Sequence, residues 1–157
     1  MAFVAGQFTA TWNALAIGQT GDGFKLNWKF FKRLITGDNL GQTPQDGVFQ
    51  GAEMFIGYTC IAYDAAAVQT VMWPYSATRW DMGVIGRTDV GSSVAKSLVL
   101  TAVAGTPAAA LPASQTFLTA VLAEGFPVEI LFAPDLREVP IRQRIYPSAS
   151  GIFSTQT

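Results

Sequence analysis

The chain has 157 residues, of which 13% are charged, and a net charge of −1. It contains no histidine and one cysteine, Cys60, which excludes internal disulfides, histidine-dependent catalytic triads and zinc sites, and four-cysteine metal clusters. The length predicts a single domain over residues 1–157 with its own hydrophobic core. No signal peptide is expected, because the first charged residue is Asp22 and the basic segment that begins such a peptide is missing.

The balance of apolar and charged residues predicts association. Hydrophobic residues make up 50% of the chain, and its charged fraction is well below the roughly 25% of an average soluble domain. We therefore expect neighbouring copies to cover much of the surface. The alternative is a very stable monomer whose apolar surface residues are scattered.

The first predicted element is a long hairpin. Apolar and polar residues alternate over residues 8–17 and again over residues 24–31, which is the period of a β-strand. The glycine-rich segment 18–23 between them predicts the turn. The aromatic residues of the second strand, including Trp28 and Phe30, are expected in the core.

A loop and a second strong strand follow. Residues 36–50 are rich in Gly, Asp, Asn, Gln and Pro, and we predict a loop of about fifteen residues, a length at which loops usually have a function. Residues 53–63 then predict a strand. Its core-facing side consists of Met54, Ile56, Tyr58 and Cys60.

The clearest helix follows that strand. It is predicted over residues 65–73, with Asp64 as its N-cap, and Pro74 ends it. Irregular structure is expected over residues 75–93.

The second half of the chain predicts further strands. Residues 96–103 read as a strand, residues 104–113 as a proline-containing loop, and residues 116–122 as a strand or a short helix. The uncharged run 97–123 is long enough to cross a bilayer, but its Gly, Pro, Ser and Thr residues argue against a membrane span. A final strand pair is predicted over residues 126–132 and 138–146.

The last predicted strand has two distinct faces. Val139, Ile141 and Ile145 are expected to face the core, while Arg142 and Arg144 share the other face. With about six strands, one helix and no alternation of strand and helix, the chain predicts a mainly β fold. We expect a β-sandwich or barrel-like fold with one flanking helix and long loops.

Candidate catalytic groups are few. Cys60 lies in an apolar strand and is expected to be a buried, inert thiol. The segment 86–93 resembles a phosphate loop superficially, but the lysine that should follow its last glycine is absent. Two carboxylate pairs remain, Glu124 with Glu129 and Asp135 with Glu138, and nothing near them predicts a pocket that would separate their pKa values. We expect no enzyme activity, no cofactor and no metal.

A basic segment offers a nucleic-acid hypothesis. Lys25, Lys29, Lys32 and Arg33 alternate with aromatic residues, a pattern that can bind single strands by stacking. The chain as a whole has ten basic and eleven acidic residues and no recognition motif, so sequence-specific binding is not expected.

Several segments resemble a known family of virion proteins. They are the run 38–51, the strand to Tyr63, the helix ending in Met72-Trp-Pro-Tyr75, the run 99–108, and residues 126–147 with the turn Arg137-Glu-Val-Pro140. Together they cover roughly residues 20–150 and are similar to the major tail tube proteins of tailed bacteriophages.

The resemblance implies a structural role in the phage virion. Six copies would form a ring whose inner strands join in a continuous β-barrel, and stacked rings would form the conduit through which DNA passes without specific contact, after assembly in the host cytoplasm. Residues 36–50 would reach a neighbouring subunit, residues 1–7 would be an N-terminal arm that ties rings together, and residues 148–157 would be a C-terminal tail. The implied contact residues are Phe3, Asp38, Leu40, Gln42, Pro44, Asp46, Phe49, Arg137 and Glu138.

Two other roles stay open. The chain could form another ring in the virion, as a tail terminator, a neck or connector protein, or a capsid decoration protein. It could also be a carbohydrate-binding β-sandwich module that uses exposed Trp12, Trp73 or Trp80.

Overall fold

The computed structural model describes residues 7–62, 65–74, 94–103, 113–125 and 138–156. Its regular elements in chain order are β1 (Phe8–Trp12), β2 (Leu15–Ala16), β3 (Gln19–Thr36), the short 3₁₀ helix η1 (Asp38–Leu40), β4 (Pro44–Ala62), α1 (Ala65–Met72), β5 (Lys96–Ala102), β6 (Ser114–Leu122), β7 (Val139–Ile145) and β8 (Ser154–Gln156). The mainly β class predicted from the sequence is confirmed.

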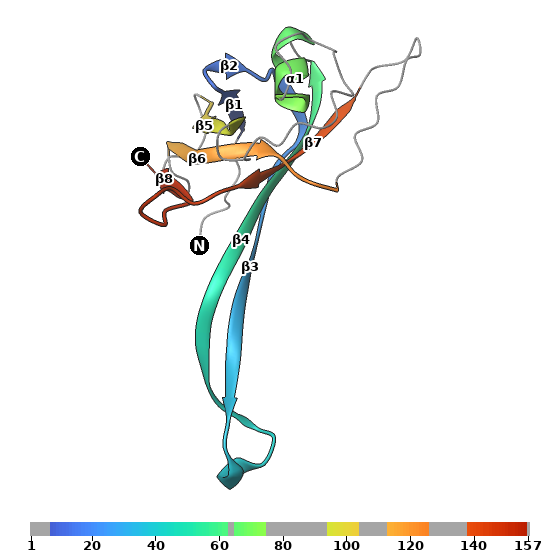
Figure 1. Cartoon of the computed structure of the whole chain (residues 1–157). Coiled ribbons are helices and arrows are strands. Elements are labelled where there is room, and N and C mark those ends of the chain that lie inside the picture. The colour runs from blue at the N-terminus through green and yellow to red at the C-terminus, as the bar shows by residue number, and fades with distance from the viewer. Residues whose placement is uncertain (1–6, 63–64, 75–93, 104–112, 126–137, 157) are drawn as a thin grey trace.

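The described strands form one antiparallel sheet. Its order is β2-β1-β5-β6-β7-β4-β3, and β8 pairs with β6 beside this path. Two parts of the molecule are distinct in Figure 1: a body that contains α1 and most of the strands, and a long two-stranded ribbon made by β3 and β4 that projects from it.

The core of the body follows the two-residue period of the strands. On β7 and on the part of β4 that lies in the body every second residue is buried, and these side chains pack with Phe117 and Ala120 of β6, with Trp12 of β1 and with one face of α1. The predicted core residues of residues 53–63 and 139–145 are confirmed: Ile56, Tyr58, Cys60, Val139, Ile141 and Ile145 are buried, and Met54 packs against them.

The projecting hairpin is defined here as residues 28–53. Pairing between β4 and β7 begins at Met54, which lies opposite Trp28 on β3. From this pair to the tip of the hairpin, β3 and β4 have only each other as neighbours in the described sheet. At roughly 3.3 Å per residue, the 18 residues of β3 extend about 60 Å. A compact domain of this length has a radius of gyration of about 15 Å, so the strand must leave the body.

The predicted hairpin between residues 8–17 and 24–31 is wrong. The chain instead turns at Asn13 and Ala14, which both have positive φ, and this two-residue turn joins β1 to the short strand β2. The other side of β1 pairs with β5, and β3 pairs with β4. Alanine is unfavourable at positive φ, so no turn signal at this position marked the reversal.

The predicted fifteen-residue loop is also wrong in its extent. β3 continues to Thr36 and β4 begins at Pro44, so only residues 37–43 connect them. An exposed ribbon accepts polar residues on both faces, and a β-bulge next to Gly51, whose φ is 145°, accommodates the shift of register in its middle. Proline fits the first position of β4 because it opens the strand.

The remaining predictions were largely correct. Helix α1 and strands β5 and β7 lie where the sequence places them, and the ambiguous segment 116–122 is a strand. The C-terminal tail contributes β8. Asp64 and the segments 1–6, 75–93, 104–112 and 126–137 lie outside the described residues. In the part of the chain that the structure describes, no helix is long and apolar enough to cross a membrane.

A projecting hairpin as the candidate interaction site

One face of the projecting hairpin carries large, exposed apolar side chains, with Lys32 between Phe30 and Leu34 on the same face. We call the side chains of Trp28, Phe30, Leu34 and Phe49 the apolar stripe. Between 56% and 60% of each residue is exposed. The first three lie at even spacing on β3, and the ring of Phe30 meets that of Phe49 edge to face at 6.2 Å, so all four share one face of the ribbon.

The apolar stripe continues the core face of the body. On β3, Leu26 precedes Trp28 on the same face and packs against the buried core. On β4, Ile56 lies opposite Leu26, and Met54 lies opposite Trp28. The same alternation therefore produces core inside the body and an exposed stripe beyond it.

A groove adjoins the root of this stripe. It lies between β1 and the start of β3, has a volume of about 990 Å³, and opens to solvent. Its apolar lining includes Phe8, Phe24, Leu26, Leu100, Val103 and Phe117. The lining also contains polar residues, among them Thr20, Asp22 and Gln115, and Leu26 belongs both to the groove and to the face that carries the stripe, so the two adjoin each other.

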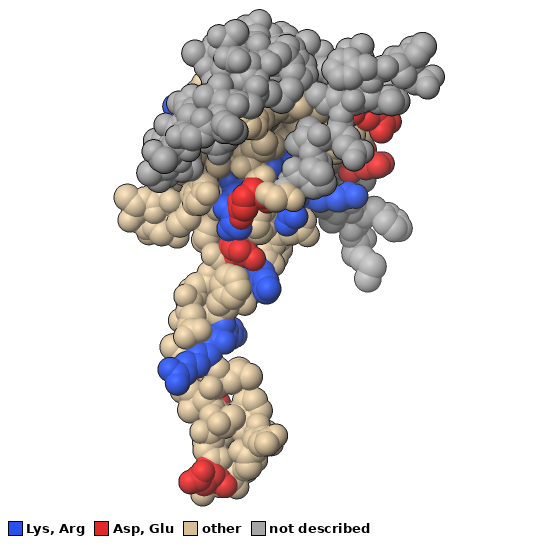
Figure 2. Space-filling model, turned by 45° about the vertical axis from the view of Figure 1, so that its right-hand side comes forward, with Lys and Arg blue, Asp and Glu red and all other residues tan. Residues whose placement is uncertain are grey.

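The opposite face of the same strands carries most of the cations, together with the exposed side chains of Phe31, Ile35 and Val48. Lys25, Lys29 and Arg33 are spaced four residues apart on β3 and are exposed, and Arg142 and Arg144 lie on the neighbouring part of β7. We call these five cations, with the rings of Phe31 and Phe55 between them, the charged face. Figure 2 shows cations at the root of the projecting hairpin and over the half nearer the body, and acidic residues at its tip.

Aromatic rings support the cations of this face. Lys29 Nζ lies 5.5 Å from the centre of the Phe31 ring. The guanidinium groups of Arg142 and Arg144 lie 4.3 Å and 4.4 Å from the centre of the Phe55 ring. These contacts hold the cations close to the sheet by cation–π attraction.

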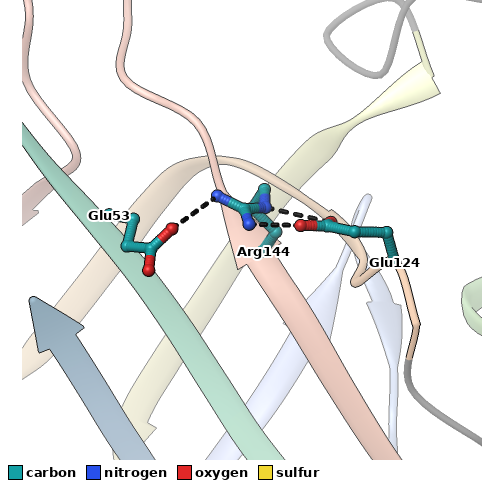
Figure 3. Close-up of polar contacts among 3 residues, drawn as sticks. All are labelled: Glu53, Glu124 and Arg144. Atoms are coloured by element: carbon teal, nitrogen blue, oxygen red, sulfur yellow. Dashed lines mark hydrogen bonds and ion pairs between the residues drawn. The ribbon is translucent and has the colours of Figure 1, made fainter.

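Arg144 connects the root of the hairpin to the body. It donates hydrogen bonds to both carboxylate oxygens of Glu124, from Nε to Oε2 at 2.9 Å and from Nη2 to Oε1, and its Nη1 lies 3.4 Å from Oε2 of Glu53 on β4 (Figure 3). The hydrogen bonds from Arg144 lower the pKa of Glu124, and the same bonds raise the pKa of Arg144. This bridge neutralises Arg144 within the charged face.

Two buried polar side chains of the body have hydrogen-bond partners, whereas Nε2 of the buried Gln143 has none among the described residues. Trp12 Nε1 donates to the carbonyl oxygen of Ala120 at 2.9 Å, and the Tyr58 hydroxyl donates to Oε1 of Gln143 at 3.3 Å. Burial raises the pKa of Tyr58 and raises that of Cys60 to about 12. Cys60 is thus the buried thiol that the sequence predicted.

Most of the predicted contact residues lie on the projecting hairpin or at its tip. Asp38, Leu40, Gln42, Pro44, Asp46 and Phe49 are all exposed there. Glu138 is exposed but lies in the body, just before β7, so the structure does not group it with the others. Phe3 and Arg137 lie outside the described residues.

Sequence reasoning misplaced the strongest part of this site. Trp28 and Phe30 were predicted in the core, yet they are 56% and 59% exposed because no further strand or helix of the described chain covers this stretch of the sheet. The available signal was the length of the alternating run, which is too long for one strand to remain inside a small body.

Other candidate sites lose support. Trp12 is 2% exposed and cannot serve as a carbohydrate platform, Trp73 is partly buried, and Trp80 lies outside the described residues. Glu124 of the first carboxylate pair is bonded to Arg144, while Glu129 and Asp135 fall outside the described part. Across the described ranges no three Cys, Asp or Glu residues come together as a metal site.

Comparison of the chain with known protein families and with curated proteins finds no match. The candidate site therefore rests on its geometry: an exposed apolar stripe, an adjoining groove, and a charged face on the opposite side.

Proposed function

We propose that this chain is a structural subunit that assembles with copies of itself through the projecting hairpin, and that it is the tail tube subunit of a tailed bacteriophage. The single observation that carries assembly is the apolar stripe, four large side chains held on a two-stranded ribbon outside the body. The tail tube is the assembly implied by the family resemblance of residues 20–150.

The stripe is costly to leave in water. Full burial of a large apolar side chain contributes about 1.5–3 kcal/mol; because 56–60% of each stripe residue is exposed, the four contribute about 4–7 kcal/mol before the costs of association, which are of similar size. A single contact of this kind gives modest affinity. Several contacts made at once around a ring give a stable assembly, which suits a subunit that must stay soluble until it polymerises.

The apolar groove supports a neighbour of the same kind. One chain carries both an apolar projection and an apolar groove of about 990 Å³, and the projection points away from the body. If the hairpin of one copy lies on the groove surface of the next, the contact is head to tail and generates rings or stacks.

The free edge of β3 supports further pairing. This strand is the last in the sheet, and its outer side has no described partner over its 18 residues. A long open edge invites another strand, and a closed ring of subunits satisfies such edges in a controlled way. In the proposed tube these edges join neighbouring sheets into the barrel that encloses DNA.

Electron microscopy of negatively stained full-length protein, together with light scattering, tests the proposal. We expect hollow tubes or stacked rings from the wild type. The variant Trp28→Ser with Phe30→Ser should stay folded by circular dichroism and remain monomeric, because it removes half of the apolar stripe. The matched control is Phe31→Ser, which removes a neighbouring exposed ring from the opposite face and should still assemble.

The outcomes separate the alternatives. Single rings that do not stack would favour a terminator, neck or decoration role over the tube. Assembly by the double variant at wild-type protein concentration would show that the apolar stripe is not the contact. A wild-type chain that stays monomeric at high concentration would overturn the proposal of self-assembly.

A further inference from the structure

We propose that the charged face binds the phosphate backbone of duplex DNA without regard to sequence. This goes beyond the proposed function, in which DNA passes through a tube without a dedicated contact, and it does not depend on ring formation. The proposal rests on the spacing of the cations, their exposure, and the way aromatic rings hold them.

The spacing of the cations follows from the strand. Lys25, Lys29 and Arg33 are four residues apart, so the two-residue period of β3 places all three on one face. Successive cations are separated by roughly 13 Å, at about 3.3 Å per residue. This distance is close to the roughly 12 Å width of the major groove, whose two borders are phosphate chains.

A second strand widens this row of cations into a surface. Lys25 lies opposite Gly57, and Gly57 lies opposite Arg142, so Lys25 and Arg142 flank a glycine without a side chain. A shallow groove of about 200 Å³ includes Lys25, Arg142 and Asp22 in its lining. The two exposed cations are therefore free to meet the same phosphate chain, and Asp22 is the acid that opposes them.

The described charges of this surface sum to a positive value. The five cations of the charged face, less Glu53, Glu124, Asp22 and Asp46, leave a charge of +1, although the whole chain has a net charge of −1. Arg144 is neutralised by its two carboxylates, so the cations available to phosphate are Lys25, Lys29, Arg33 and Arg142. A local positive surface of this kind attracts a polyanion at moderate ionic strength.

The aromatic rings decide between duplex and single strand. Proteins that bind single strands use open aromatic faces on which bases stack. Here Lys29 lies over Phe31, and Arg142 and Arg144 both lie over Phe55, so the chain's own cations occupy the rings. The cations cover part of these rings, although Phe31 is 41% exposed, and contact through phosphates alone carries no sequence information.

The test is fluorescence anisotropy with a labelled 30-base-pair duplex of random sequence, with full-length protein between 50 and 200 mM salt. With four phosphate contacts, we expect log K to fall with log salt at a slope of about −3 to −4. The variant Lys29→Gln with Arg33→Gln should reduce the magnitude of the slope by about 2, and Asp22→Asn should tighten binding.

Lys32→Gln is the matched control. It removes the same charge from the same strand, but Lys32 lies on the side of the apolar stripe, where its side chain and that of Leu34 border Gly47. We expect it to leave the slope nearly unchanged, whereas Lys29→Gln alone should reduce the magnitude of the slope by about 0.9. Equal effects of Lys32→Gln and Lys29→Gln would overturn the proposal, as would tighter binding to a single strand of the same length.

Absence of duplex binding at 50 mM salt would also overturn it. If Lys29→Gln with Arg33→Gln then abolished assembly in the microscope, the charged face would be an interface with an acidic surface of another copy. That result would leave the proposed function standing while removing the DNA contact.

Discussion

Strands β3 and β4 run through both the body and the projecting hairpin, yet the same alternation of apolar and polar residues has opposite outcomes in the two regions. In the body, Ile56 and Tyr58 of β4 are 1% and 5% exposed because β7 and the other strands surround them. In the hairpin, Phe30 and Phe49 are 59% and 60% exposed on a ribbon with no described third strand. An apolar face predicts that other residues pack against it, but the pattern does not indicate whether those residues belong to the same chain or to another molecule.

The two regions should therefore have different roles: the body determines the stability of the fold, and the projecting hairpin determines association with other copies. An isolated two-stranded hairpin is at best marginally stable in water, so the projecting part adds little to the free energy of unfolding. The body, with its shared core and helix, holds the fold. Substitutions in the body should therefore change stability, and substitutions in the hairpin should change association.

Substitution of Trp12 should cause the largest loss in the free energy of unfolding. Trp12→Ala removes a side chain that is 2% exposed and leaves the Ala120 carbonyl oxygen without its donor. We expect a loss of about 3–5 kcal/mol in the free energy of unfolding, measured by urea denaturation. A loss below 1 kcal/mol would show that the core does not depend on β1.

The reactivity of Cys60 gives a second measure of the body. Its pKa of about 12 rather than the ordinary 9.0 makes the thiolate about a thousandfold rarer at pH 8. We expect labelling by a thiol reagent to be slow in the folded chain, to accelerate in urea along the unfolding transition, and to be unaffected by Trp28→Ser. Fast labelling of the folded protein would mean that this part of β4 opens independently of the body.

The sequence predicted the body well because local pattern and burial agree there. The alternation of Met54, Ile56, Tyr58 and Cys60 is cleanly apolar on one side, and the helix has a proline at its end. The sequence did not predict β2, because the chain reverses at Asn13 and Ala14 and alanine is unfavourable at positive φ.

The site was predicted only in part, for a related reason. Asp38, Leu40 and Phe49 were assigned to contacts through the resemblance, and the structure places them on or at the tip of the hairpin. Trp28 and Phe30 were assigned to the core because local alternation carries no information on how many strands lie beside a residue. The length of β3 relative to the size of the body is the property that decides exposure.

The ion pairs of Arg144 lie at the boundary between the body and the projecting hairpin. Their contribution to the free energy of unfolding should be smaller than that of Trp12 and should depend on pH. The pKa of Glu124 is lowered in the folded chain, so its stabilisation is present above its ordinary pKa of 4.5 and is lost as pH falls through the lowered value. Because 64% of the Glu124 side chain is exposed, we expect only about 0.3–1 kcal/mol.

Urea denaturation of the wild type and of Glu124→Gln at pH 7 and pH 3 measures this contribution. The variant should be slightly less stable at pH 7, and the difference should become smaller at pH 3, because the stabilisation by the carboxylate is lost as it takes up a proton. A difference that is the same at both pH values would contradict the electrostatic origin. High salt at pH 7 should reduce the difference, since the pair is exposed to solvent.

Trp28→Ser should have the smallest effect on the free energy of unfolding, and it tests the contrast between the body and the projecting hairpin most directly. Trp28→Ser replaces the same residue type as Trp12→Ala, but at a position that is 56% exposed on the ribbon. In dilute, monomeric protein we expect the free energy of unfolding to change by less than about 0.5 kcal/mol, as for other surface substitutions. At concentrations where the wild type assembles, the same variant should lose the added stability that assembly provides. A large loss in the monomer would show that the stripe packs within its own chain, and the division between a stabilising body and an associating hairpin would then fail.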